Sequence, residues 1–170
     1  SCTVPSTISD ENGTPLTTNS HPVGYAGYVS PAIEEKGIKS VFYKDGPAGI
    51  GETAWPTEML IACAFDKKLW YEFGNAIGKE CERKQVDIWL APAVNLHRNP
   101  LCGRNFEYFS EDPFLSGKMS VASTGGIKDG GAWGTIKHFA LNGQESHRFK
   151  IDAVCSERAI REIYLKSFEM

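Results

Sequence analysis

The sequence of 170 residues predicts an α/β fold built around a parallel sheet. Strand-like segments at 38–43, 86–94 and 134–140 alternate with helix-like segments at 66–84, 112–130 and 156–170. Polar, reactive side chains follow the carboxyl end of each strand-like segment. In open sheets and barrels of this class the ligand binds at that end of the strands. We therefore expect one polar ligand site there.

The first half of the chain contains one predicted strand and one predicted helix. Residues 38–43, IKSVFY, are largely β-branched or aromatic and follow Gly37, which is typical of a strand. Asp45 lies just past its carboxyl end. The helix expected at 66–84 begins at the capping residue Asp66. Its apolar side chains recur at intervals of three and four residues, at Leu69, Trp70, Phe73, Ile77 and Cys81.

The second half contains two further strand and helix pairs. Residues 86–94, VDIWLAPAV, are mostly apolar, as expected of a strand buried on both faces. The next helix begins at Asp112, a capping residue followed by proline, and ends at Gly130. Residues 134–140, GTIKHFA, form the third predicted strand, and Ser156 caps a helix that continues to the end of the chain.

The domain organisation follows from these elements. Residues 1–23 are rich in Ser, Thr, Pro and Asn without a sustained period, so we expect an irregular leader before a domain at 24–170, with a packed turn around Gly24 and Gly27. Three βα units do not close a (β/α)8 barrel of the TIM type, which takes about 250 residues. Alone they would expose apolar edges. We expect the first units of a larger barrel, incomplete in this chain, or a chain that another chain completes.

Composition excludes several classes of partner. A net charge of −3 provides no basic surface for nucleic acid or an anionic membrane, and no apolar run approaches the roughly twenty residues of a membrane span. The first residues lack a signal-peptide pattern, so a cytoplasmic location is expected.

Five widely spaced cysteines form no ligand cluster, and Cys63 and Cys81 are expected to be apolar core thiols. With no dinucleotide or phosphate-loop pattern, we expect neither metal nor cofactor.

The loop at 91–112 is rich in arginine, asparagine and acidic side chains, which suit a polar ligand, although a solvated loop has the same composition. The interleaved rings of Phe106, Tyr108 and Phe109 favour a surface for a sugar ring. Lys137 and His138 form an adjacent pair at the end of a buried strand, which is costly unless a ligand or an acid uses them. An ion pair of Lys137 with Glu107 or Glu145 is the alternative. For Lys137 and His138 to reach the same ligand, the backbone must bend, because side chains alternate along a regular strand.

Four motifs carry a resemblance to a known family. They are APAVNLHRNPLCGRNFEYFSEDPFLSGK at 91–118, KDGPAGI at 44–50, TIKHFALNGQESHR at 135–148 and SERAIREIYLKSFE at 156–169. Together they resemble the N-terminal barrel domain of glycoside hydrolase family 3, which includes β-glucosidases and β-xylosidases. The resemblance implies that the terminal, non-reducing sugar is bound by Asp45, Arg104, Lys137, His138 and Arg148. It leaves Glu107, Glu111 and Glu145 as acids that hold the arginines and the loop.

The resemblance also implies what this chain lacks. The family is similar to retaining glycosidases with two carboxylates, and its nucleophile is an Asp usually followed by Trp, a pair absent here. The acid/base comes from a second domain. We therefore expect no catalytic residue in this chain and no activity of the chain alone. The expected partners are a β-glucoside or short β-linked oligosaccharide and the remainder of the barrel with its second domain, or another chain.

Two alternatives to a β-glucosidase stay open: a β-xylosidase, and a truncated, non-catalytic fragment that binds a sugar or a partner. One departure from the family bears on the sugar pocket. The arginine usually found six residues after the KDGP aspartate is Gly51 here, and the loop that leads to Trp55 is shortened.

Overall fold

The computed structural model describes residues 7–9, 15–18, 27–30, 32–39, 41–51 and 53–170. Its main sheet has the strand order β3-β4-β5-β6. The strand bounds are Gly27–Ser30 for β3, Val41–Asp45 for β4, Ile88–Leu90 for β5 and Trp133–Gly134 for β6. β3 pairs antiparallel with β4, whereas β4, β5 and β6 are mutually parallel. The expected mixed α/β fold with a parallel sheet is confirmed.

The parallel strands are shorter than the sequence predicts. β4 begins at Val41 because Ile38 instead pairs with Ile33 around a short 3-10 helix, η1 (Glu34–Lys36). The regular ladder of β5 and β6 stops early, although the chain remains alongside: Lys137 N donates to Pro92 O at 3.0 Å, and Val94 N donates to Lys137 O at 2.7 Å. Proline has no N–H to continue a ladder, which explains the interruption.

Helix α2 (Lys67–Arg83) has the predicted bounds and the predicted cap. The Asp66 carboxylate accepts hydrogen bonds from the backbone N–H groups of Lys68 and Leu69. Trp70, Phe73, Ile77 and Cys81 are buried, as expected. Leu69 was predicted to lie on the same buried face, but it is 39% exposed. Its neighbour Trp70 is the residue of this turn that points into the core.

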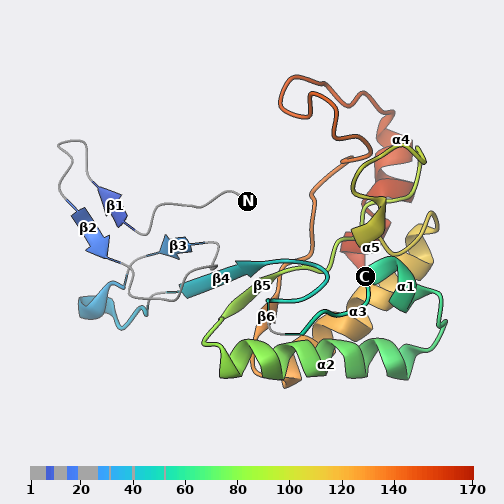
Figure 1. The fold of residues 1–170 in the computed structure, drawn as a ribbon. Helices are drawn as coiled ribbons and strands as arrows, with labels where there is room; N and C mark the ends of the chain where they lie inside the picture. The colour runs from blue at the N-terminus through green and yellow to red at the C-terminus, as the bar shows by residue number, and fades with distance from the viewer. Residues whose placement is uncertain (1–6, 10–14, 19–26, 31, 40, 52) are drawn as a thin grey trace.

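Helix α3 (Pro113–Asp129) also begins where predicted, with the Asp112 side chain accepting from two backbone N–H groups of its first turn. It packs closely against α2. A Cβ added at Gly74 or Gly78 of α2 would collide with the backbone of Ser123 or Ile127 of α3, so only glycine fits at these two positions. Figure 1 shows both helices on one side of the sheet. There they cover Trp89 of β5, a fully buried side chain at the centre of the core.

The C-terminal helix is less regular than expected. Ser156 caps α4 (Glu157–Ala159), which continues as a π-helical turn, η3 (Ile160–Tyr164), and then as α5 (Lys166–Glu169). The Ser167 hydroxyl donates to Pro113 O at 2.9 Å and ties α5 to the start of α3. A short helix that the sequence analysis missed, α1 (Glu58–Ala62), precedes α2 and is capped by Thr57.

Within the leader expected at 1–23, the described residues form two short strands. β1 (Thr7–Ser9) and β2 (Pro15–Thr18) pair antiparallel, apart from the main sheet in Figure 1. Residues 24–26 of the expected turn lie outside the described residues, and Gly27 belongs to a strand instead. None of the helices described is long and apolar enough to cross a membrane.

Candidate functional site

Asp45, Lys137 and Glu107 meet where the parallel strands end. Asp45 is the last residue of β4, and its Oδ1 accepts from Lys137 Nζ at 3.0 Å. The same ammonium group lies 3.4 Å from Glu107 Oε2. The Glu107 side chain is only 3% exposed, whereas that of Asp45 is 62% exposed. The buried Glu107 thus fixes the ammonium group of Lys137, and Lys137 in turn holds the solvent-exposed carboxylate of Asp45.

Arg104 and Arg148 extend this set of charges. Arg104 Nε pairs with Glu107 Oε1, and Arg104 Nη1 lies 3.7 Å from Glu145 Oε1. Arg148 Nη1 donates to Glu145 Oε2 at 3.1 Å. Asp45, Lys137, Glu107, Arg104, Glu145 and Arg148 therefore form one continuous series of ion pairs, named here the charge network. The ion pair of Lys137 with Glu107, which was the alternative to a ligand contact, is present, and Glu107 and Glu145 hold the arginines as expected.

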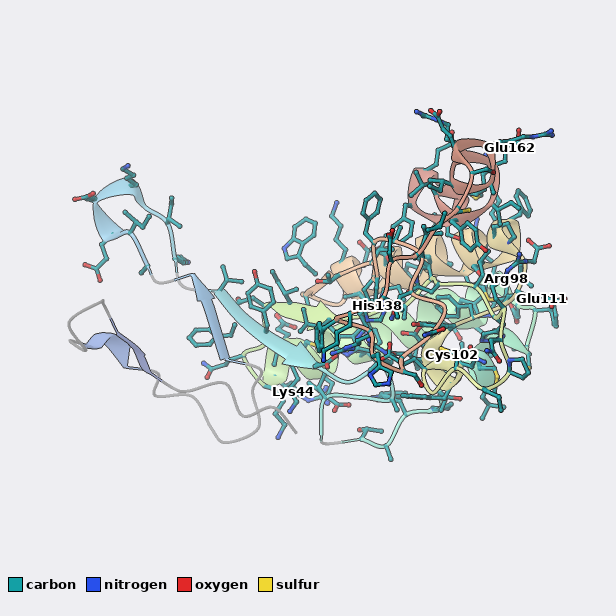
Figure 2. The ribbon with its side chains drawn as sticks, turned by 90° about the horizontal axis from the view of Figure 1, so that it is seen from above. Lys44, Arg98, Cys102, Glu111, His138 and Glu162 are labelled. Atoms are coloured by element: carbon teal, nitrogen blue, oxygen red, sulfur yellow. The ribbon has the colours of Figure 1, made fainter. Side chains whose placement is uncertain are left out.

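His138 lies beside this network, fixed by Asn95. Asn95 Nδ2 donates to His138 O at 2.9 Å, and Asn95 Oδ1 accepts from His138 N at 2.7 Å and lies 3.0 Å from His138 Nδ1. Burial, with the positive charges of Arg104 and Lys137, lowers the pKa of His138 to about 4. Its imidazole is therefore neutral at neutral pH. Figure 2 shows it beyond the tip of β4.

Lys137 and His138 lie beyond the regular part of the third parallel strand. β6 ends at Gly134, and a turn follows His138 from Phe139 onward. Lys137 bridges to Ala93 of the neighbouring chain segment, and His138 turns toward Asn95. The five predicted site residues thus lie together around one end of the sheet.

Asn142 connects the buried Tyr108 to Glu145 of the charge network. Asn142 Nδ2 donates to the Tyr108 hydroxyl oxygen at 3.1 Å and to Glu145 Oε1 at 2.9 Å. Burial raises the pKa of the Tyr108 phenol. For Glu145, burial raises the pKa, but hydrogen bonding from Asn142 and the charges of Arg104 and Arg148 outweigh it, so the net shift is downward.

The expected aromatic surface is only partly present. Tyr108 and Phe109 are buried and belong to the core, whereas Phe106 is 46% exposed. Phe106 borders an open hollow of about 480 Å³ whose lining begins at Gly46, the residue after Asp45. The other walls of this hollow include Gly46, Pro47, Gly49, Gly51 and Thr53. One ring, rather than three, is therefore available to a ligand on this side.

The loop after Asp45 is anchored although it is short. Trp89 Nε1 donates to Gly46 O at 2.8 Å, and Glu80 accepts from Thr53 N at 3.1 Å and from Trp55 Nε1 at 3.0 Å. Burial raises the pKa of Glu80, but these hydrogen bonds lower it by more. Gly51 has a positive φ of 99° and open space where a Cβ would lie. Lys137, not a residue at 51, holds the Asp45 carboxylate.

Two expectations for this region were wrong, and one residue was missed. Glu111 is exposed and pairs with no arginine in the described part of the chain, because it precedes α3 on the outer surface. Cys63 is exposed at the end of α1, whereas Cys81 is buried as expected. Glu58 is fully buried and accepts from Ala93 N at 2.9 Å. Thr57 signals the start of α1, but nothing in the sequence marks Glu58 as buried.

No group of three His, Cys, Asp or Glu side chains suited to a metal ion is present in the described residues. The arrangement instead defines an α/β domain with a dense set of charged donors and acceptors at the carboxyl end of parallel strands, a class that binds polar small molecules. Residues 29–170 match the glycosyl hydrolase family 3 N-terminal domain, and the chain belongs to this family.

Named relatives show how much of a family member the chain covers. β-Glucosidase A of Butyrivibrio fibrisolvens is 49% identical over 146 residues, which are 81% of this chain and 18% of the relative. An exo-α-(1→6)-L-arabinopyranosidase of Bifidobacterium longum is 38% identical over 81% of this chain and 20% of the relative. The structure of β-glucosidase 3B of Thermotoga neapolitana in complex with α-D-glucose superposes with a TM-score of 0.82 at 43% identity, covering 91% of this chain and 24% of that chain. The chain thus spans about a fifth of the length of the curated relatives it matches.

Proposed function

We propose that the protein containing this chain hydrolyses terminal, non-reducing β-D-glucosyl residues, and that this chain supplies the groups that bind the terminal sugar. The charge network carries the proposal. Its buried middle, Glu107 with Lys137, is held rigidly, while its two ends, Asp45 and Arg148, remain open, with side chains 62% and 43% exposed. Such a pre-ordered set of charges binds hydroxyl groups without first paying for its own ordering.

Each proposed contact follows from the hydrogen-bonding capacity left in the network. Asp45 Oδ1 accepts from Lys137 and from the Gly46 amide, and Oδ2 has no partner within the described residues, so it is available to a sugar hydroxyl. Lys137, Arg104 and Arg148 donate charge-assisted bonds, each contributing about 1.5 to 3 kcal/mol. Neutral His138 offers one ring nitrogen beyond Asn95.

The three parallel strands are proposed to be the first units of a (β/α)8 barrel that the rest of the protein completes. Ile88 and Leu90 support this, because they lie on the face of β5 opposite the buried Trp89 and are only half-buried in this chain. The rest of the protein then supplies the nucleophile and the acid/base of a retaining mechanism, two carboxylates about 5 Å apart. The 170-residue chain alone is therefore expected to be inactive.

The test compares the complete reading frame with residues 1–170 alone. The complete protein is expected to release 4-nitrophenol from 4-nitrophenyl β-D-glucoside and to form β-glucose first, as NMR of the fresh product detects. The separate chain should release none. Hydrolysis by the purified 170-residue chain, or glucose released first as the α-anomer, would overturn the corresponding part of the proposal.

A pentopyranosidase is the second candidate, favoured by the Bifidobacterium longum relative. Xylose and arabinopyranose lack the 6-hydroxymethyl group of glucose, so a pocket that contacts this group discriminates against them. In assays with matched 4-nitrophenyl glycosides, the β-glucoside is expected to have the highest kcat/KM. A higher value for the β-xyloside or α-L-arabinopyranoside would replace the glucose assignment. A complete reading frame without any turnover, but with glucose binding, would indicate the non-catalytic alternative.

A further inference from the structure

Glu58 is a fully buried acid beneath the charge network, and none of the roles described so far uses it. Its Oε2 accepts from Ala93 N at 2.9 Å, and its Oε1 is buried without a partner in the part of the chain described. Glu58 belongs to α1, outside the sheet, whereas Ala93 lies just beyond β5. One carboxyl group therefore connects the helix to the strand end.

Ala93 is the backbone position at which the site segments meet. It forms parallel bridges with both Lys137 and Tyr108, and it is itself fully buried. Lys137 carries the ammonium group of the network, and Tyr108 directly follows Glu107. A buried N–H needs a partner, and among the residues that the structure describes the Ala93 N–H finds it in the Glu58 side chain. Displacement of Ala93 would move both flanking segments.

We propose that Glu58 is a positioning residue that clamps the Ala93 amide and thereby sets the spacing between Lys137 and Glu107 in the sugar site. This inference rests on the proposed function for its effect on sugar binding. The clamp itself is a property of the chain. Glu58 touches no ligand in this account, and it acts only through Ala93.

The surroundings of Glu58 favour the protonated acid. Burial raises its pKa well above the usual value, the Ala93 amide lowers it, the charge of Glu107 raises it further and that of Lys137 lowers it. Glu107 and Lys137 are the charged groups that act on it. In the acid form Oε2 accepts from the amide and Oε1 carries the proton, so no unpaired charge is buried. Glutamine offers the same acceptor and a donor in nearly the same shape.

The enzymatic test uses the complete protein with Glu58→Leu, Glu58→Gln and the control Glu72→Gln on the exposed face of α2. Glu58→Leu removes the acceptor, and KM for the glucoside is expected to rise about tenfold, with kcat changed far less, since misplaced binding groups weaken sugar binding. Glu58→Gln is expected to restore most of that loss, and the control to change neither constant. A Gln variant as impaired as the Leu variant would overturn the clamp.

Two measurements without sugar test the role of Glu58 even if no glycoside is cleaved. One follows the protonation of its carboxyl group, and the other follows hydrogen exchange of the Ala93 amide. The infrared carbonyl band of a protonated carboxyl group, followed as the pH is raised, is expected to persist in wild type above the usual titration range of glutamate and to be absent in Glu58→Gln. The Ala93 amide is expected to exchange with solvent faster in Glu58→Leu, but not in Glu58→Gln. Unchanged exchange of the Ala93 amide in Glu58→Leu contradicts the inference. If the complete wild-type protein cleaves no glycoside, that result counts against the proposed function alone.

Discussion

Lys137 Nζ lies 3.0 Å from Asp45 Oδ1, an ion pair between residues 92 positions apart in the sequence. The pair joins the end of β4 to the segment after β6, across the intervening strand β5. Because parallel strands end at one edge of the sheet, the fold brings these two side chains together without a dedicated loop.

Lys137→Met is expected to weaken glucose binding at least about tenfold and to lower the free energy of unfolding by about 3 kcal/mol, because it leaves the buried Glu107 with one partner fewer. Glucose titration calorimetry and urea unfolding measure these effects. Lys68→Met is the control, since the Lys68 pair with Glu72 is exposed and contributes about 0.5 kcal/mol at most. Equal effects of the two substitutions would show that Lys137 has no special role.

His138 is expected to titrate with a pKa of about 4, because burial and the charges of Arg104 and Lys137 disfavour its protonated form. NMR of the imidazole carbons across pH 3 to 8 measures this directly. A midpoint for His138 near 6.5, the ordinary histidine value, would show that the imidazole is solvated and not held beside the network.

Glu58→Gln should gain stability relative to wild type as the pH rises above about 4.3, the unfolded-state pKa of glutamate. The folded pKa of Glu58 is raised, so wild type loses stability as the pH climbs toward that value, and glutamine does not titrate. The contribution of His138 cancels because both proteins contain it. Urea unfolding at pH 4, 5, 6 and 7 measures the difference, and a difference independent of pH would mean that Glu58 is not perturbed.

Gly74→Ala is expected to destabilise the protein by several kcal/mol, because the added methyl group meets the backbone of Ser123 where α2 and α3 cross. Gly125→Ala is the matched control on α3, where the new methyl group meets no atom within 4 Å apart from its own chain neighbours and the adjoining helix backbone. It should stabilise by about 0.5 to 1 kcal/mol, the helix propensity difference. Thermal unfolding of both variants measures the contrast, and similar midpoints would contradict the close helix packing.

Cys63 and Cys81 should differ sharply in thiol reactivity. Cys63 is exposed, whereas burial raises the pKa of Cys81 to about 12. At pH 8, a disulfide reagent is expected to label Cys63 in the folded protein and Cys81 only after unfolding, as peptide mass mapping determines. Rapid labelling of Cys81 in the folded state would show that the core between α2 and the sheet opens readily.

The long helices and the alternation of elements could be predicted from the sequence because their signals are local. Asp66 and Asp112 mark helix starts through their own side chains, and the apolar period follows within the same segment. The candidate site residues could be named from the sequence because they lie in four motifs that resemble those of a known family. That Asp45 meets Lys137 follows from the shared edge of a parallel sheet, which the alternation already indicates.

The remainder depended on tertiary contacts that no local pattern encodes. Ile38 lies in a β-branched run yet pairs with Ile33 outside the sheet. Tyr108 and Phe109 look like ligand-facing rings in the sequence, but packing places them in the interior. The burial of Glu58 was invisible for the same reason: its partner is a backbone amide 35 positions away.

A crystal structure of the complete protein with glucose bound tests the central claim most directly. The account predicts one hexose at the carboxyl end of the parallel strands, with hydroxyl groups within hydrogen-bonding distance of Asp45, Lys137 and His138 and with Arg104 and Arg148 completing the ring of donors. Glucose bound elsewhere, with the charge network empty or turned away from it, would contradict the claim that this chain holds the sugar.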